Sequence, residues 1–182
     1  MNHRVFVAID LPERIKEELS TISYALPGAK WIDGENLHLT LQFIGEVDGL
    51  VLEELKTSLV RVHSSAFPLH LQGLGYFSRR KTPSVLWISV DCQTSVVNLQ
   101  KKIKNSLFPL GLKLDHSKFS PHITLARLKD TPIVRLQNYL YEFGLFKTSS
   151  FMVHDFSLIS SQLTPKGAKY TIESNFNLSA PA

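Results

Sequence analysis

Apolar residues recur along the chain with two spacings, one typical of strands and one typical of helices. Alternating or continuous short apolar runs predict strands, because successive side chains of a strand point to opposite faces. Apolar residues three and four positions apart predict helices that bury one face. The predicted strands cover residues 4–9, 36–44, 67–77, 85–90, 119–128, 151–160 and 169–174. The predicted helices cover residues 13–24, 51–63, 94–107 and 133–143.

The order of these elements repeats. Strand, helix, strand, helix and strand follow one another twice, and an apolar strand closed by an aspartate opens each half, at Asp10 and at Asp91. No linker rich in proline, glycine and serine separates the halves, so residues 1–182 are expected to form a single domain with two pseudo-symmetric lobes. The predicted class is α+β: two antiparallel-rich sheets with helices on their outer faces, around a central cleft.

Two short segments carry candidate chemistry, and each half of the chain holds one. They read Leu-His-Leu-Thr-Leu, with His38 and Thr40, and Pro-His-Ile-Thr-Leu, with His122 and Thr124. A strand has a period of two, so each histidine shares a face with its threonine while the apolar residues between them bury. If a pseudo-twofold relates the halves, the two pairs face each other across one cleft.

Two opposed imidazoles suit phosphodiester chemistry. Displacement at phosphorus requires a base for the attacking group and an acid for the leaving oxygen, and histidine serves as either near pH 7. Two hydroxyls can donate to the phosphate oxygens where negative charge builds up. Neither motif has a carboxylate or a further histidine two to four residues on, so no metal and no cofactor are expected.

The alternative is a structural role. A lone histidine in a strand is more often a packed residue than a catalytic one, and a single His-x-Thr occurs by chance. Two copies at similar offsets in a repeated pattern favour catalysis. His3, His63, His70, His116 and His154 lack such a context and are expected to be surface or packing residues.

With these motifs the chain resembles the two-histidine phosphoesterase superfamily. More closely, it is similar to the bacterial and archaeal RNA 2′,3′-cyclic phosphodiesterases, historically called 2′-5′ RNA ligases. The resemblance extends over nearly the whole chain, through the stretches 4–12, 31–47, 74–77, 85–87, 121–127 and 161–170.

The resemblance implies that the protein opens an RNA-terminal 2′,3′-cyclic phosphate to a 2′-phosphomonoester. By this analogy His38 protonates the departing 3′ oxygen, His122 activates water, and Thr40 and Thr124 hold the phosphate oxygens. The same site would also run the reverse step, which joins RNA ends through a 2′-5′ bond. The implied partner is RNA with cyclic phosphate ends, such as tRNA fragments.

The resemblance also implies base stacking by Phe43 and phosphate contact by Arg127. Each lies five residues after its histidine, and strict alternation would turn both side chains into the core. A β-bulge beyond each motif would turn them into the cleft instead. Core packing is the alternative for Phe43, whereas an unpaired buried guanidinium is costly for Arg127. The basic turn Arg79-Arg80-Lys81 is either a solvated turn or a rim that attracts RNA phosphates.

Composition narrows the class of protein. Hydrophobic residues make up 43% and charged residues 20% of 182 residues, which excludes disorder. No apolar run approaches the ~20 residues that span a bilayer, and no signal-peptide pattern opens the chain. Cys92 is the only cysteine and is expected to be a packing residue. We therefore expect a cytoplasmic monomer without membrane contact.

The net charge of +4 and the pI of about 9.2 allow an anionic ligand without requiring one. Two other functions stay open at this point. One is a cyclic phosphodiesterase acting on a small nucleotide metabolite, and the other is a non-catalytic RNA-binding module, which would not need two matched imidazoles.

Overall fold

A computed structural model describes residues 3–91, 93–114, 118–164 and 167–180. Cys92 and His116, for which packing or surface roles are expected, lie outside these residues. The strands are β1 (His3–Asp10), β2 (Ala29–Trp31), β3 (His38–Val47), β4 (Phe67–Leu69), β5 (Leu71–Arg79), β6 (Thr82–Val90), β7 (His122–Leu128), β8 (Phe151–Val153), β9 (Asp155–Thr164) and β10 (Gly167–Asn177). The α-helices are α1 (Glu13–Ser20), α2 (Gly49–Leu59), α3 (Gln93–Leu107) and α4 (Ile133–Glu142), and short 3₁₀ turns lie at Gly34–Asn36 and Phe108–Leu110.

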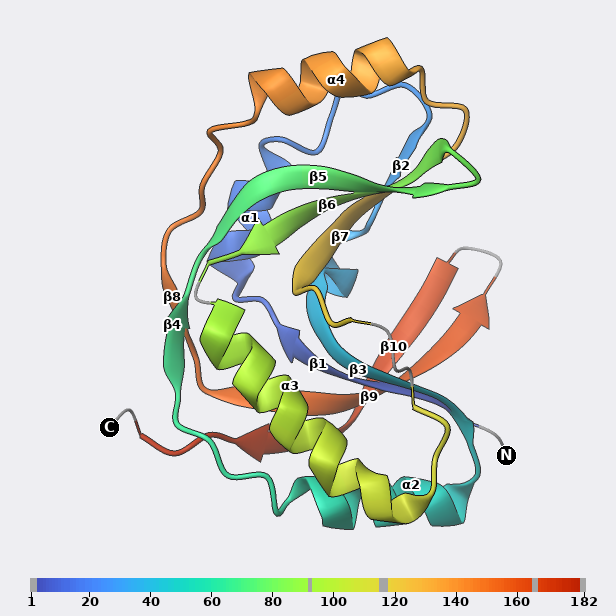
Figure 1. Ribbon diagram of the computed structural model, residues 1–182, viewed down its shortest axis with the longest axis vertical. Helices are drawn as coiled ribbons and strands as arrows, with labels where there is room; N and C mark the ends of the chain where they lie inside the picture. Colours follow the sequence, from blue (N-terminus) through green and yellow to red (C-terminus); the bar gives the residue numbers. More distant parts are fainter. Residues whose placement is uncertain (1–2, 92, 115–117, 165–166, 181–182) are drawn as a thin grey trace.

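Eight strands form one antiparallel network that divides naturally into two halves. The order is β10-β9-β1-β3-β7-β6-β5, with β2 also paired to β7. β3 and β7 are joined by the single pair Leu39–Ile123, and the halves spread apart from this contact (Figure 1). The predicted α+β class is confirmed. The two sheets that the sequence analysis expected are joined into one by a single residue pair. β4 and β8 form a separate two-stranded sheet.

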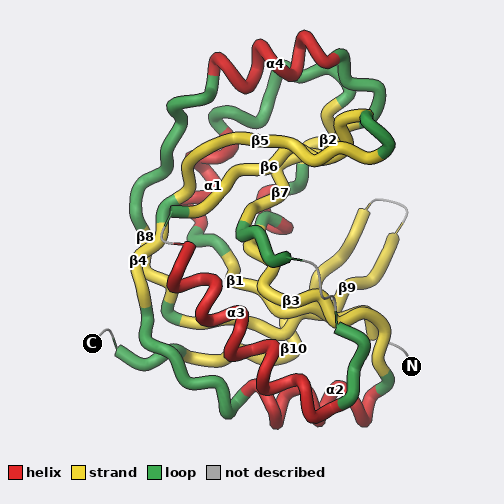
Figure 2. Tube along the Cα trace, viewed as in Figure 1, coloured by secondary structure: helices red, strands yellow, loops and turns green. Residues whose placement is uncertain are grey.

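Helices cover the outer sides of both halves. α3 packs against β3 and beside α2, whereas α4 lies beyond the half that contains β5, β6 and β7 (Figures 1 and 2). The Tyr139 hydroxyl of α4 donates a hydrogen bond to the Ile22 carbonyl, which joins α4 to the segment after α1. The largest cluster of buried apolar side chains runs through both halves, from Val5 and Leu39 to Leu86 and Ile123. None of the helices in the described part of the chain has both the length and the apolarity that crossing a bilayer requires.

The first helix is shorter than the periodicity predicts. It ends at Ser20 instead of extending to residue 24. The hydroxyls of Ser20, Thr21 and Ser23 donate to backbone carbonyls three or four residues earlier, and the amide of Thr21 already bonds three residues back. Such side chains compete with the helical ladder and favour turns, which apolar spacing alone does not register.

Two predicted strands are each divided in two. The run 67–77 breaks at His70, where the chain leaves β8 and begins to pair with β6. The run 151–160 breaks at His154, where the chain leaves β4 and begins to pair with β1 and β10. The alternation continues across His70, so only the change of partner reveals that break, whereas at His154 it changes phase between Val153 and Phe156. β2 was not predicted, because three residues are too few to show a period.

Candidate active site

The contact between β3 and β7 brings the two His-x-Thr motifs together. Because the strands are antiparallel and Leu39 pairs with Ile123, the register sets His38 opposite Thr124 and Thr40 opposite His122. Leu39 and Ile123 are fully buried, whereas the four polar residues lie on the opposite, half-exposed face. Two imidazoles and two hydroxyls therefore form one compact four-membered group.

These four side chains line a cavity of about 240 Å³ between the two halves of the sheet. Phe43 and Arg127 line the same cavity, so the structure brings together all six residues that the sequence analysis singled out. The opposite wall comes from the β9–β10 hairpin, through Ser161, Leu163 and Tyr170.

Each histidine is oriented by the carbonyl two residues before it. Nδ1 of His38 lies 2.7 Å from the Asn36 carbonyl oxygen, and Nδ1 of His122 lies 2.8 Å from that of Ser120. A carbonyl only accepts, so Nδ1 must carry a hydrogen in both rings. Nε2 is then bare in the neutral ring and protonated in the imidazolium. Both histidines thus have Nε2 free to serve as either a base or an acid.

His38 is held between two aromatic rings. The ring centroids of Phe6 and Tyr170 lie 4.9 and 5.3 Å from that of the imidazole. Burial lowers the pKa of His38, because the imidazolium loses hydration. The hydrogen bond to the Asn36 carbonyl and the nearby Asp10 charge act in the opposite direction, to a smaller extent. The free cleft therefore favours neutral His38.

His122 lies against a different pair of rings. Phe77 contacts it edge-on with a centroid distance of 4.9 Å, and the Trp87 centroid lies 6.2 Å away. Trp87 occupies the space over Gly75, where an added Cβ would overlap Cζ2 of the indole. Gly75 is therefore the residue that lets Trp87 reach its position beside His122.

A β-bulge follows each motif and turns Phe43 and Arg127 into the cavity. Val7 pairs with Gln42 and Ala8 with Thr40, so Leu41 has no partner of its own on β1. The alternation changes phase there, and Phe43 becomes 42% exposed. Core packing, the alternative for Phe43, is wrong.

The second strand repeats this feature at the same distance from its histidine. Leu86 pairs with Ala126 and Trp87 with Thr124, which leaves Leu125 as the extra residue and Arg127 exposed. The matching bulges explain why a residue at an odd offset from the histidine reaches the cavity.

Several cavity residues were not identified from the sequence. Phe6 lies on β1, beside the motif strand β3, whereas Tyr170 on β10 and Phe77 on β5 reach the histidines from strands that do not pair with the motif strands. Only the pairing of distant segments places these rings there. Arg4 was also missed. Its guanidinium lies 5.1 Å from the centre of the Phe43 ring, a cation–π arrangement that holds the ring against the cavity entrance.

Within the described ranges, no group of three or more histidine, cysteine, aspartate or glutamate side chains is close enough together to hold a metal ion. The cavity supplies imidazole, hydroxyl and guanidinium groups. All three kinds of group can donate hydrogen bonds to an anion, and an imidazolium can also give it a proton.

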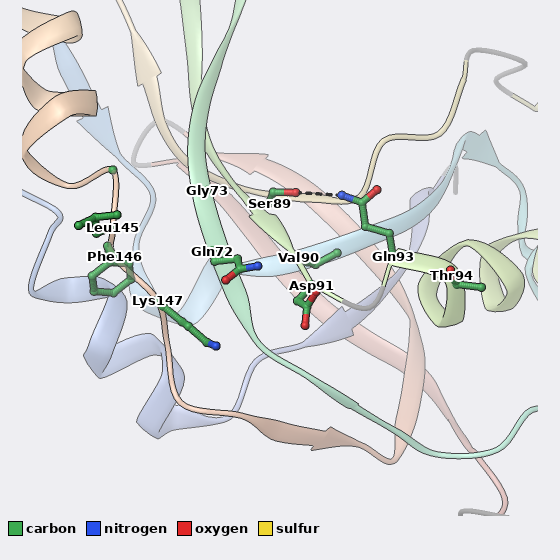
Figure 3. A pocket seen from close by; sticks show the side chains of 11 residues that line it. Gln72, Gly73, Ser89, Val90, Asp91, Gln93, Thr94, Leu145, Phe146 and Lys147 are labelled. Atoms are coloured by element: carbon green, nitrogen blue, oxygen red, sulfur yellow. Dashed lines mark hydrogen bonds between the residues drawn. The ribbon is translucent and has the colours of Figure 1, made fainter.

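A second, larger hollow of about 810 Å³ lies where β5 begins and β6 ends, beside the start of α3 (Figure 3). Its side chains include Gln72, Asp91 and Lys147, and Gln93 donates to the Ser89 hydroxyl 3.3 Å away. None of the described residues that line it is a histidine. The smaller cavity is therefore the candidate active site.

Comparison with known proteins gives consistent matches across the chain. Residues 11–164 match the family model of the 2′-5′ RNA ligase superfamily. A Thermotoga maritima protein named RNA 2′,3′-cyclic phosphodiesterase is 35% identical over 175 residues, which cover 93% of this chain and 92% of the relative. An Archaeoglobus fulgidus protein of the same name is 33% identical over 171 residues, covering 92% and 96%.

Two solved structures share the architecture. The crystal structure of TT0787 from Thermus thermophilus has a TM-score of 0.82 at 27% identity, with 98% of this chain and 100% of that chain covered. Apo LigT from E. coli has a TM-score of 0.80 at 25% identity, with 98% of each chain covered.

Proposed function

Because the chain belongs to the 2′-5′ RNA ligase superfamily, we propose that it is a cyclic phosphodiesterase that opens the 2′,3′-cyclic phosphate at the end of an RNA. The observation that carries this proposal is the register of β3 and β7, which opposes two His-Thr pairs across one small cavity. Relatives with the corresponding name cover nearly the whole chain, which supports the substrate class.

The proposed reaction is an in-line displacement at phosphorus. His122 Nε2 takes a proton from water as the water oxygen bonds to phosphorus. The bond from phosphorus to the 3′ oxygen breaks, and His38 Nε2 gives its proton to that oxygen. The product carries a 2′-phosphomonoester and a free 3′ hydroxyl. One histidine must be neutral and the other protonated at the same moment, which two rings with free Nε2 atoms allow.

His38 can act as the acid although burial lowers its pKa in the free cleft. The cyclic phosphate is an anion, and its charge beside the ring favours the imidazolium. Substrate therefore supplies part of the stabilisation that the buried ring lacks.

The remaining cavity groups position the phosphate and the terminal base. The hydroxyls of Thr40 and Thr124 donate to the non-bridging oxygens, where negative charge grows in the transition state. Arg127 makes no ion pair among the described residues, so its guanidinium is free to contact phosphate. Phe43, exposed and backed by Arg4, presents a ring face on which a base can stack.

We propose that the reaction needs no metal ion and that the same site catalyses 2′-5′ joining of RNA ends. One imidazole takes a proton from the attacking group and the other gives a proton to the leaving oxygen, which accounts for both directions. Microscopic reversibility supports the reverse reaction, and water at high concentration favours hydrolysis.

We further propose that the two halves are pseudo-symmetric lobes of a single domain that works as a cytoplasmic monomer. Each motif strand lies beside the strand that opens its half, β1 beside β3 and β6 beside β7. One strand from each half of the sequence also pairs with the opening strand of the other half: β5 pairs with β6, and β9 pairs with β1.

The test is incubation with a ten-nucleotide RNA that ends in a 2′,3′-cyclic phosphate, such as a tRNA fragment end, after dialysis against EDTA. We expect a product that phosphorus NMR identifies as a 2′-monoester, at a rate that EDTA does not change. Binding without turnover would identify an RNA-binding module. Turnover of a cyclic mononucleotide but not of the RNA would identify a metabolite phosphodiesterase. Activity that only added zinc or magnesium restores would reject the acid–base scheme.

A further inference from the structure

The tip of the β5–β6 hairpin has an unusual backbone for its sequence. Arg79 and Thr82 are the last paired residues, and Arg80 and Lys81 form the two-residue turn between them. Both turn residues have positive φ, 50° and 67°. Such a turn favours Asn-Gly, because a side chain with a Cβ is disfavoured in the left-handed region. The hairpin thus keeps two long cationic side chains at positions where conformational preference would select neutral, small residues.

The tip lies in line with the active-site cavity. Phe77, which contacts His122, is two residues before Arg79 on β5, so the two side chains point to the same face, ~7 Å apart along the strand. Phe77 also pairs with Val85, which pairs with Arg127 across β6 and β7. Val85 and Phe77 therefore connect Arg127 inside the cavity with Arg79 at the start of the tip.

These cations are not neutralised. Arg79, Arg80 and Lys81 are exposed, and none of them forms an ion pair with a carboxylate in the ranges that the structure describes. The facing β9–β10 hairpin contributes Leu163 and Ala168 to the cavity, and Arg4 on β1 adds a further positive charge to its lining. Strain retained at a hairpin tip together with unpaired charge points to a ligand of opposite charge.

We propose that the tip of the β5–β6 hairpin is a second binding site, which holds the phosphate backbone of the RNA upstream of the cyclic end. This proposal rests on the proposed function, since it assumes that the terminal nucleotide occupies the cavity. The preceding nucleotides leave the cavity past Arg127 and run over Arg79, Arg80 and Lys81. Contacts to phosphate carry no base information, so the site favours long RNA over mononucleotides without selecting a sequence.

The double substitution Arg80→Asn with Lys81→Gly tests the site without disturbing the hairpin, because Asn-Gly suits this turn better than the natural pair. An unchanged or raised melting temperature verifies that the hairpin persists. The matched control is Lys101→Ala with Lys113→Ala, which removes the same charge from exposed positions on and after α3, outside the cavity.

Turnover is measured on two substrates, a 2′,3′-cyclic mononucleotide and a ten-nucleotide RNA with the same terminal nucleotide. For the tip variant we expect kcat/KM on the RNA to fall by roughly 5–20-fold at 50 mM salt, through KM, while the mononucleotide changes less than twofold. The slope of log kcat/KM against log salt should become shallower by about 1.4, or 0.7 for each lost phosphate contact. An unchanged RNA value, or an equal fall on both substrates, would overturn the proposal.

Failure of the proposed function would be distinguishable. In that case the wild-type protein would hydrolyse neither substrate, and the tip site would be judged by binding alone. Fluorescence anisotropy with a labelled ten-nucleotide RNA ending in a 3′ hydroxyl should then show roughly 5–20-fold weaker binding for the tip variant than for the wild type and the control. Equal affinities for all three proteins would reject the site.

Discussion

At the scale of single residues, each imidazole is oriented by a backbone carbonyl and not by a carboxylate. The Asn36 and Ser120 carbonyls lie two residues before His38 and His122, so both rings receive the same orientation from local chain geometry. Local geometry of this kind can be repeated in two places of one chain. It leaves Nε2 of both rings free for proton transfer. The two rings then differ in the aromatic side chains that pack around them.

Removal of either imidazole should strongly reduce turnover. We expect His38→Ala and His122→Ala each to lower kcat by roughly 10²–10⁴, and the double variant to be only slightly worse, because the two rings act as a unit. Thr40→Ala and Thr124→Ala should cost about 1–3 kcal/mol each in transition-state binding. His63→Ala, an exposed histidine, is the matched control. Near-native turnover of either histidine variant would remove that ring from the mechanism.

The aromatic ring beside His38 should set one limb of the pH profile. Burial lowers the pKa of His38, and Tyr170 contributes to that burial. We expect a bell-shaped profile of kcat/KM whose lower apparent pKa lies below the usual histidine value of ~6.5 and moves up toward it in Tyr170→Ala. Tyr170→Phe keeps the ring and should keep the profile. If Tyr170→Ala leaves both limbs in place, packing by Tyr170 does not control the titration.

At the scale of elements, two matching bulges and one glycine shape the cavity. The bulges at Leu41 and Leu125 reverse the facing of the residues that follow, which gives the cavity its ring at Phe43 and its cation at Arg127. Gly75 lets β5 approach β6 closely enough for Trp87 to lie over it. The position of His122 therefore depends on a strand that carries no catalytic group.

Gly75→Ala should impair catalysis from outside the set of reacting groups. The added Cβ would overlap the indole, so Trp87 must shift, and His122 loses the ring that packs against it. We expect the free energy of unfolding to fall by about 1–3 kcal/mol and kcat to fall as well. Gly49→Ala is the control, because nothing lies within 4 Å of its added Cβ. Full activity of Gly75→Ala would show that Trp87 does not position His122.

At the scale of the whole molecule, the proposed active site lies where the two halves meet. The halves share a core, and among the described residues β3 and β7 pair through Leu39–Ile123 alone, the pair that sets the two motifs opposite each other. Any motion that separates the halves therefore changes the distance between acid and base. Stability and catalysis are linked through this contact.

Global stability should depend on pH through His38. Its pKa is lower in the folded protein than in the unfolded chain, so the unfolded chain takes up the proton first as the pH falls. The free energy of unfolding should thus be at its full value above pH ~6.5 and fall as the pH drops from there through the folded pKa. His38→Gln should flatten this dependence in urea titrations at pH 7.5 and 5.5. An identical pH dependence in the variant would assign it to other groups.

Spacing within the chain was enough to identify the candidate chemical groups and most of the elements. Short-range periodicity decides which residues share a strand face, so His38 with Thr40 and His122 with Thr124 were evident from spacing alone. The helices 51–63, 94–107 and 133–143 were also predicted to within a few residues of α2, α3 and α4. These features depend on neighbours in the chain, which a sequence displays directly.

The tertiary structure decided what surrounds those residues. The bulges, the change of partner at His70 and His154, and the placing of Tyr170 beside His38 depend on which distant strands pair and in what register. Pairing is settled by the burial of a common core and by ladder hydrogen bonds between segments far apart in sequence, and periodicity within one segment carries no record of it. The candidate reacting groups could therefore be identified from the sequence. The environment that distinguishes one imidazole from the other exists only in the folded protein.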